Sequence, residues 1–375
     1  MNRLRIGILG GGQLGRMMAL AGYPLDLAFS FYDSNPDCPS AALGQRFGDA
    51  ENSSASLDVF IDSADVFTYE FENIPVEWVE RIAAKKPVFP GVKSLSVSQN
   101  RLNEKKLFAG LKIPSARFAE IRSEADLQSA VKELGLPLVI KTVTMGYDGK
   151  GQFLLKTEEQ IAQAWAELGA QAPLIAEEFI HFKRELSIIA VRGRDGKTVS
   201  YPLTENVHHR GILSHSIAPA PFVDNDTQLT AERYISAILH ELDHVGAVTL
   251  EMFETRHGLF ANETAPRVHN SGHWTIEGAR CSQFENHVRA VAGLPLGDTT
   301  CDRPTAMLNI IGQHPKTEEI LQMKDAHLHL YGKTEREGRK LGHITLTANN
   351  HHELANGITQ IADLLPNPMA LFPGK

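Results

Sequence analysis

Short apolar runs alternate with helical patterns through the first hundred residues, and this alternation limits the possible folds more than any other feature. Residues 6–9 form an apolar run that ends in three glycines, after which Leu14 and Met17 begin a helical spacing. Later apolar runs at 27–32 and 66–69 predict two further strands, which end at Asp33 and Glu70. The pattern predicts an α/β unit with a parallel, doubly wound sheet, whose ligands bind beyond the carboxyl ends of the strands.

The middle of the chain predicts a small α+β unit built around a glycine loop. Ser123 opens a capping-box-like helix that stops at Gly135. The hydrophobic patterns predict strands at 138–141, 152–155 and 174–180, and a later helix at 231–241. The last 75 residues predict short strands, such as 326–330 and 343–347, and one final helix.

Composition narrows the class of protein. A chain of 375 residues suits two or three domains, and its net charge of −8 argues against a general nucleic-acid binder. No apolar run is long enough to span a membrane, and the N-terminus has no signal-peptide pattern. Cys38, Cys281 and Cys301 are widely spaced, which favours neither disulfides nor a metal site and predicts a reducing cytoplasm.

The segment from Gly10 to Gly15 matches a GxGxxG motif between a strand and a helix. Such a loop allows backbone N–H groups to approach a phosphate, and Asp33 lies where a dinucleotide fold places its ribose-binding acid. Taken alone, the motif favours an NAD-dependent oxidoreductase. The alternative is that the glycines only permit close packing of the strand against the helix.

A second glycine loop follows Lys141 and contains Gly146, Gly149 and Gly151. A lysine at the end of a strand neutralises phosphate oxygens, while glycines allow the backbone to fold over them as a lid. The lysine precedes the loop, so this is not a Walker A motif. The alternative is an ordinary hairpin turn at Asp148-Gly149.

Two glutamates, Glu251 and Glu263, follow short apolar runs that are joined around His257-Gly258. This spacing predicts neighbouring antiparallel strands, on which two inward carboxylates beside Asn262 would bind Mg²⁺ through oxygen ligands. Solvated strand glutamates are the alternative. The next segment favours a polar site because its polar side chains follow no apolar period: Arg267, His269, Asn270 and His273.

A basic cluster near the C-terminus suits a substrate phosphate, although a solvated charged loop is the alternative. Its members are Lys333, Arg336, Arg339 and Lys340. Glu70 and Glu72 alternate at a strand end, so one of them is expected to face inward. His327 and His329 share a strand face without a nearby acidic or cysteine partner, and we interpret them as structural.

Seven segments together resemble the ATP-grasp superfamily, and closely the N5-carboxyaminoimidazole ribonucleotide synthetases of purine biosynthesis. They are GGGQLGRM, FENIP, NRLNEKKLF, GYDGKGQ, YPLTENVHHRGIL, NETAPRVHNSGHW and GRKLGH. The resemblance implies a Rossmann-like domain at 1–98, an ATP-grasp domain at 99–298 with a lid subdomain near 115–180, and a small β-rich domain at 299–375. It also implies a homodimer.

The resemblance implies roles for individual residues. ATP is expected to contact Arg101, Lys141, the lid residues Gly146, Tyr147, Asp148, Gly149, Lys150, Gly151 and Gln152, the adenine hinge Glu177, Glu178, Phe179 and Ile180, then Glu185, His208, Asn262 and Glu263. Glu251 and Glu263 are expected to bind two Mg²⁺ ions. Aminoimidazole ribonucleotide is expected to contact Gln13, Leu14, Glu72, Tyr147, Asp148, Lys150, Arg267, His269, Asn270, Lys333 and Arg339.

The implied reaction uses ATP to activate bicarbonate as carboxyphosphate, whose carboxyl group is then captured by the amine of the ribonucleotide. The residues expected to take part are Lys141, Tyr147, Asp148, Arg267 and His269. Three rivals remain: a formate-dependent glycinamide ribonucleotide transformylase, an NAD-dependent oxidoreductase, and a non-catalytic nucleotide sensor. Family loops often carry arginine, glycine and proline where this chain has Val143, Met145 and Glu337.

Overall fold

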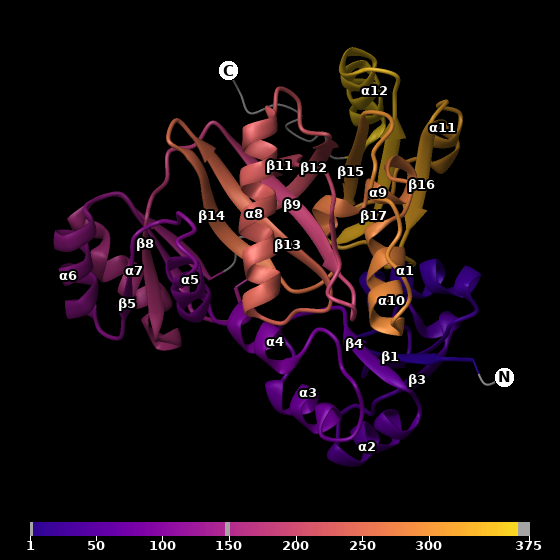
Figure 1. The fold of residues 1–375 in the computed structure, drawn as a ribbon. Helices are drawn as coiled ribbons and strands as arrows, with labels where there is room; N and C mark the ends of the chain where they lie inside the picture. The colour runs from indigo at the N-terminus through magenta and orange to yellow at the C-terminus, as the bar shows by residue number, and fades with distance from the viewer. Residues whose placement is uncertain (1–2, 147–150, 367–375) are drawn as a thin grey trace.

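The computed structural model describes residues 3–146 and 151–366, which form three sheets flanked by helices (Figure 1). The N-terminal unit lies at the bottom of the view, and the four-stranded sheet formed by residues 118–178 lies at the left. A large sheet occupies the centre and continues to the upper right. Among the described residues, no helix combines the length and apolar character needed to cross a membrane.

The N-terminal sheet is parallel and confirms the predicted alternation of strands and helices. Its strands lie in the order β3 (Gln45–Phe47), β2 (Ala28–Tyr32), β1 (Arg5–Leu9) and β4 (Val66–Tyr69). Helices α1 (Gln13–Gly22), α2 (Ser54–Asp62) and α3 (Val76–Ala83) follow these strands in the chain. The carboxyl ends of β1 and β4 are neighbours, so the glycine loop and Glu70 meet at one edge of the sheet.

The second sheet forms the lid subdomain. Its strands lie in the order β5 (Phe118–Ile121), β8 (Leu174–Glu178), β6 (Leu138–Thr142) and β7 (Gln152–Leu155), packed against α6 (Glu124–Leu134) and α7 (Ile161–Leu168). The Ser123 side chain accepts from the Asp126 N–H and caps α6, as the sequence predicts. β8 ends at Glu178 rather than at 180, because its partner strand β6 begins at Leu138 and the preceding Pro137 has no N–H to donate to the sheet.

The third sheet has nine strands, and the C-terminal strands belong to it. Its order is β14 (Gly258–Ala265), β13 (Gly246–Thr255), β9 (Arg184–Arg192), β11 (Thr204–His209), β12 (Ile212–Ala218), β15 (Thr305–Ile311), β17 (Lys340–Thr347) and β16 (Ala326–Leu330), with β10 (Thr198–Ser200) paired to β9. The C-terminal part therefore extends the central sheet through the pairing of β12 with β15. This pairing places the basic segment before β17 close to the central strands.

Helices cover this sheet and connect it to the N-terminal unit. They include α8 (Asn225–Glu241), α10 (Gln283–Ala292) and α12 (His351–Leu364), and α10 packs against α1. The predicted start of α8 at residue 231 was wrong. The Asp224 side chain accepts from the Thr227 N–H, so the helix begins at Asn225 with polar turns that carry no apolar period.

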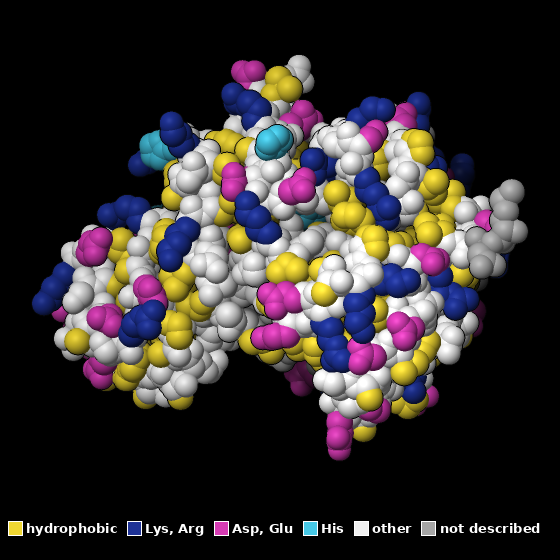
Figure 2. Space-filling view, turned by 60° about the horizontal axis from the view of Figure 1, so that its bottom comes forward, with side chains coloured by type: hydrophobic (Ala, Val, Ile, Leu, Met, Phe, Trp, Pro, Cys, Tyr) yellow, Lys and Arg dark blue, Asp and Glu magenta, His cyan; other side chains and the backbone are white. Residues whose placement is uncertain are grey.

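Charges are mixed over the face that Figure 2 shows. Side chains of Lys and Arg alternate there with those of Asp and Glu, and hydrophobic atoms lie between them. This face therefore presents no continuous basic surface in the part of the chain that the structure describes.

Candidate active site

One cavity of about 1420 Å³ opens among the three sheets and collects most of the predicted residues. Its walls come from the glycine loop, the lid sheet, the paired strands β13 and β14, and the basic segment before β17. The predicted residues that line it are Gln13, Leu14, Glu72, Arg101, Lys141, Gly146, Gln152, Phe179, Glu185, His208, Glu251, Asn262, Glu263, Arg267, His269, Asn270, Lys333 and Arg339.

The remaining predicted residues fall into two groups. Tyr147, Asp148, Gly149 and Lys150 lie outside the described residues. The others do not contribute to the wall: Gly151, Glu177, Glu178 and Ile180. Glu177 contacts Lys141, which lines the cavity, and the buried Lys105, which does not, while Glu178 forms an ion pair with Arg117 at 2.8 Å. Phe179 is the hinge residue that lines the cavity.

Two cations lie at the lid end of the cavity. Lys141 reaches it from β6, and its Nζ lies 3.0 Å from Glu177 Oε2. Burial lowers the pKa of Lys141, although the charge of Glu177 acts in the opposite direction. Arg101 begins α5 (Arg101–Gly110) and donates from its guanidinium to Glu263 at 2.8 Å. Both side chains bring positive charge to the cavity wall, which is the chemistry that suits phosphate oxygens.

Glu251 and Glu263 are direct register partners on β13 and β14, as the sequence predicts. Burial opposes ionisation of Glu263, but the charge and hydrogen bond of Arg101 outweigh it and lower the Glu263 pKa to about 2. Burial, followed by the charge of Glu263, raises the pKa of Glu251 to about 7. The pair is therefore an anionic site in which one carboxylate makes ionisation of the other unfavourable.

This pair fits a magnesium site. A divalent cation between the two carboxylates would remove the repulsion that raises the Glu251 pKa, and Asn262 adds an amide to the same wall. No cluster of three or more His, Cys, Asp and Glu side chains suited to a metal occurs among the described residues. Magnesium often takes one or two protein carboxylates together with phosphate oxygens and water, which matches this set.

Two histidines lie close to the carboxylates of the cavity. His269 Nε2 lies 3.2 Å from Glu251 Oε1, while its Nδ1 lies 2.9 Å from the Ser271 hydroxyl. Burial and the neighbouring charge of Arg267 lower the pKa of His269 well below its usual value, so its imidazole is neutral at pH 7. Burial also opposes protonation of His208, but its hydrogen bond to Glu185 outweighs that effect and raises its pKa.

The opposite end of the cavity is basic. Lys333 Nζ donates to the Gln13 side chain, which joins the C-terminal segment to the start of α1. Burial, followed by the charge of Arg339, lowers the pKa of Lys333 to about 8. Arg336 and Lys340 line the same cavity, and Arg336 is also exposed, so the basic cluster faces both the cavity and solvent. Glu337 also lines the cavity.

The glycine loop is occupied by carboxylates of the protein itself. Glu70 accepts from the N–H of Gly12 and, at 2.6 Å, from that of Gly15, while Asp33 accepts from Gly11 at 2.9 Å. A Cβ at Gly12 would lie 2.6 Å from Glu70 Oε1. A phosphate brought to these N–H groups would therefore meet Glu70, which is the closest acceptor to two of them. Both Glu70 and Glu72 line the cavity, although only one was expected to face inward.

Two further polar pairs include residues that line the cavity. Arg267 makes a two-point contact with the Glu72 carboxylate, one arm of which measures 2.8 Å. Asn270 and Asn309 exchange amide hydrogen bonds of 3.0 and 2.7 Å. Sequence patterns did not indicate Asn309, because it lies within the buried apolar strand β15.

Other expectations also needed correction. His329 does have an acidic partner, since its Nε2 lies 2.8 Å from Glu277 Oε1, and its ring stacks on His343. His329 and Glu277 lie 52 residues apart in sequence, so no local pattern indicated that they form a pair. Val143 packs against Leu102 and Ile175, and it also contributes to the wall of the cavity. Met145 has a backbone φ of 65°, a conformation that glycine adopts without strain.

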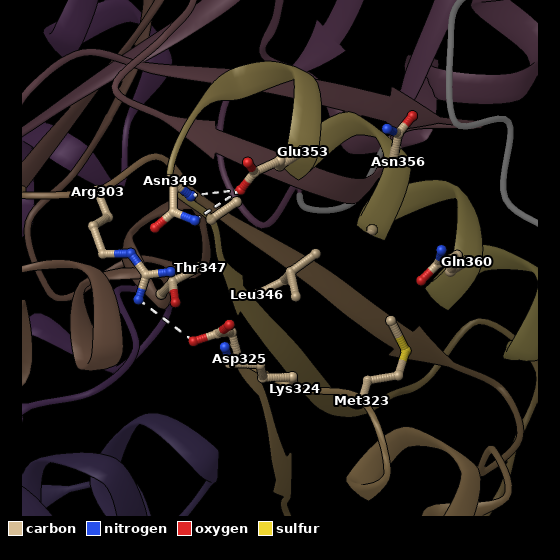
Figure 3. Close-up of a pocket in the computed structure, with 12 residues that line it drawn as sticks. Arg303, Met323, Lys324, Asp325, Leu346, Thr347, Asn349, Glu353, Asn356 and Gln360 are labelled. Carbon is tan, nitrogen blue, oxygen red and sulfur yellow. Dashed lines mark hydrogen bonds and ion pairs between the residues drawn. The ribbon is translucent and has the colours of Figure 1, made fainter.

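A separate cavity of about 320 Å³ lies in the C-terminal part, between the β17 end and α12 (Figure 3). Arg303 pairs there with Asp325, and Asn349 donates to Glu353. Its wall contains none of the residues predicted for a site.

Comparisons with known proteins agree with this geometry. The chain matches the ATP-grasp domain family at residues 106–284, the ribonucleotide synthetase preATP-grasp domain at 3–99, and the phosphoribosylaminoimidazole carboxylase C-terminal domain at 305–357. It is 47% identical over 366 residues to the N5-carboxyaminoimidazole ribonucleotide synthase of Pseudomonas aeruginosa, covering 96% of this chain and 99% of that protein. It is 42% identical to the enzyme of that name from Vibrio cholerae, covering 96% of each chain.

Solved structures show the same likeness. The synthetase from Thermus thermophilus superposes with a TM-score of 0.93 at 46% identity, over 99% of this chain and 100% of that one. The synthase from Aspergillus clavatus, solved with ADP and 5-aminoimidazole ribonucleotide, has a TM-score of 0.90 at 31% identity, over 97% of this chain and 98% of that one. The chain therefore belongs to the N5-carboxyaminoimidazole ribonucleotide synthase family of ATP-grasp ligases.

Proposed function

We propose that this protein carboxylates 5-aminoimidazole ribonucleotide with bicarbonate, using ATP, to give N5-carboxyaminoimidazole ribonucleotide, ADP and phosphate in purine biosynthesis. One observation carries the proposal. A single cavity has a lysine and paired carboxylates suited to Mg-ATP at one end, and a basic loop suited to a second phosphate at the other. A ligase that joins activated bicarbonate to a phosphorylated amine needs both ends in one enclosed space.

The first step is attack of a bicarbonate oxygen on the γ-phosphorus of ATP. A new oxygen–phosphorus bond forms while the bond to the ADP oxygen breaks, giving carboxyphosphate. Lys141 and Arg101 neutralise the charge that spreads over the transferring group. Glu251, Glu263 and Asn262 would hold two Mg²⁺ ions, which supply further charge neutralisation when bound.

In the second step the amine of the ribonucleotide takes the carboxyl carbon, directly or as released CO₂, and phosphate leaves. Arg267 is fixed by Glu72 and faces the cavity beside neutral His269, so both can hold the carboxylate. Neutral His269 donates or accepts a hydrogen bond without adding charge. We propose that Asp148 accepts the proton of the amine, and that Tyr147 and Lys150 help to exclude water from the reaction.

The ribonucleotide phosphate is proposed to bind at the basic end of the cavity. Lys333 and Arg339 supply charge, and the backbone N–H groups of Gln13 and Leu14 lie at the N-terminus of α1 next to Lys333. Because Glu70 already occupies the N–H groups of Gly12 and Gly15, a dinucleotide pyrophosphate would be repelled from the loop. This repulsion is the physical argument against the NAD-dependent alternative.

We further propose a homodimer in the cytoplasm, with domains at 1–98, 99–298 and 299–375. The three cysteines are unpaired, as a reducing compartment requires. The family-model matches end and begin near the proposed boundaries.

Phosphate release from Mg-ATP and bicarbonate tests the function. We expect 5-aminoimidazole ribonucleotide to stimulate release, whereas formate with glycinamide ribonucleotide should not, and NAD should have no effect. Lys333→Ala should raise the KM for the ribonucleotide about 100-fold, because a charge-assisted phosphate contact is lost, with little change in the KM for ATP.

Lys324→Ala, which removes an exposed lysine, serves as the matched control for Lys333→Ala. Absence of stimulation by the ribonucleotide would contradict the proposed substrate. An unchanged KM in Lys333→Ala would contradict only the phosphate site.

A further inference from the structure

Lys105 is a buried lysine for which the proposed mechanism has no role. It lies on α5 and is 1% exposed, whereas the next residue, Lys106, is exposed. Moving an ammonium group from water into a protein interior costs several kcal/mol unless good partners surround it. The partners of Lys105 therefore indicate what this charge does.

Lys105 has two oxygen partners. Its Nζ donates to the backbone carbonyl of Asn262 at 3.0 Å and lies 3.3 Å from Glu177 Oε2. The same oxygen of Glu177 accepts from Lys141 Nζ at 3.0 Å. Burial opposes ionisation of Glu177, but the charges of Lys141 and Lys105 outweigh it and lower its pKa. One buried carboxylate is therefore shared by two ammonium groups.

Each oxygen partner of Lys105 lies next to a residue that has a proposed role in the reaction. Lys141 stands on β6 of the lid sheet, and Asn262 precedes Glu263 on β14 of the large sheet. Lys105 itself does not line the cavity, so it does not reach the nucleotide directly. From outside the cavity, Lys105 therefore connects Lys141 on the lid sheet to β14, the strand of the large sheet that carries Glu263.

Neighbouring side chains on the same helix face reinforce this connection. Arg101, one turn before Lys105, donates to Glu263 at 2.8 Å. Glu104 accepts from both the N–H and the hydroxyl of Thr264, the latter at 2.6 Å. One face of α5 thus contacts three successive residues of β14, and Lys105 also reaches Glu177 on β8 of the lid sheet.

We propose that Lys105 is a positioning residue of the ligase reaction. Through Glu177 it orients the ammonium of Lys141, and through the Asn262 carbonyl it fixes the strand that carries Glu263. The spacing between the phosphate-binding lysine and the metal-binding carboxylate is thereby held constant. The inference rests on the proposed roles of Lys141 and Glu263.

Lys105→Met tests the inference because it keeps the buried stem and removes the charge. We expect kcat to fall about 100-fold and the Kd for Mg-ATP, measured by calorimetry, to rise about tenfold, since small displacements of catalytic groups have effects of this size. The KM for the ribonucleotide should stay within twofold. Lys105→Arg should recover part of kcat, and Lys106→Met on the exposed face should match the wild type.

A double-variant cycle separates positioning from simple stabilisation. If Lys105 acts through Glu177, the double variant Lys105→Met, Glu177→Gln should lose no more kcat than the worse single variant. Losses that multiply would overturn the proposal, as would a folded Lys105→Met protein whose kcat and Kd lie within twofold of the wild type. If Lys105→Met does not fold, Lys105→Gln, which keeps a donor for the Asn262 carbonyl, is expected to show the same losses.

Lys141→Met in the same calorimetric assay separates the proposed phosphate role of Lys141 from the inference about Lys105. If Lys141→Met binds Mg-ATP as the wild type does, the proposed phosphate role of Lys141 fails, and the inference about Lys105 fails with it. If Lys141→Met loses affinity while folded Lys105→Met retains it, only the inference about Lys105 is overturned.

Discussion

Replacing Lys141 by methionine is expected to reduce kcat/KM for ATP about 1,000-fold while the protein remains folded. The side chain projects from β6 into the cavity, where burial strengthens its interaction with phosphate oxygens. The loss should appear in both kcat and ATP affinity, because the charge acts on bound nucleotide and on the transferring group. Steady-state kinetics with saturating bicarbonate and ribonucleotide measure it.

A matched control is Lys156→Met, at an exposed position just after β7 in the same sheet. It should behave as the wild type. A Lys141→Met enzyme with kcat/KM within tenfold of the wild type would contradict the assignment of Lys141 to the phosphates.

Replacing Glu263 by glutamine is expected to lower kcat about 1,000-fold and to raise the Mg²⁺ concentration required for half-maximal activity. Glu263 stays ionised because Arg101 lowers its pKa to about 2, so it is the stronger anion of the pair at every working pH. A neutral amide removes that charge from the magnesium site. Activity measured over a titration of Mg²⁺ at fixed ATP reports both effects.

Glu167→Gln, at an exposed position on α7, is the control for loss of a carboxylate elsewhere. If Glu263→Gln showed the wild-type magnesium dependence, the paired carboxylates would not be the metal site. Excess Mg²⁺ should restore part of the activity of Glu263→Gln, because Glu251 remains on the neighbouring strand.

Strands and helices with a clear pattern of apolar residues were predictable from the sequence. Apolar runs bounded by glycine or acidic residues predicted β4 and β16 to the residue, and the hairpin spacing predicted that Glu251 and Glu263 pair. These predictions held because the signal lies within a few residues of the element itself. The resemblance to a known family supplied the acceptor substrate, which no local pattern indicates.

Contacts between distant segments could not be predicted. Glu70 and Gly15 lie 55 residues apart, so the sequence suggested an open phosphate loop where the structure has a carboxylate. Helix α5 carries Glu104 and Lys105 in a polar stretch, which periodicity assigns to solvent. Both side chains are buried because their partners come from β14 and β8, and only the fold brings those strands to the helix.

The origin of the oxygen atoms in the released phosphate tests the central claim most directly. Bicarbonate labelled with ¹⁸O is mixed with enzyme, Mg-ATP and ribonucleotide, and the phosphate is analysed by mass spectrometry before the label exchanges with water. Activation as carboxyphosphate predicts one ¹⁸O in each phosphate, because the attacking bicarbonate oxygen stays on phosphorus when the carbon–oxygen bond breaks. Unlabelled phosphate, formed together with carboxylated ribonucleotide, would contradict the account.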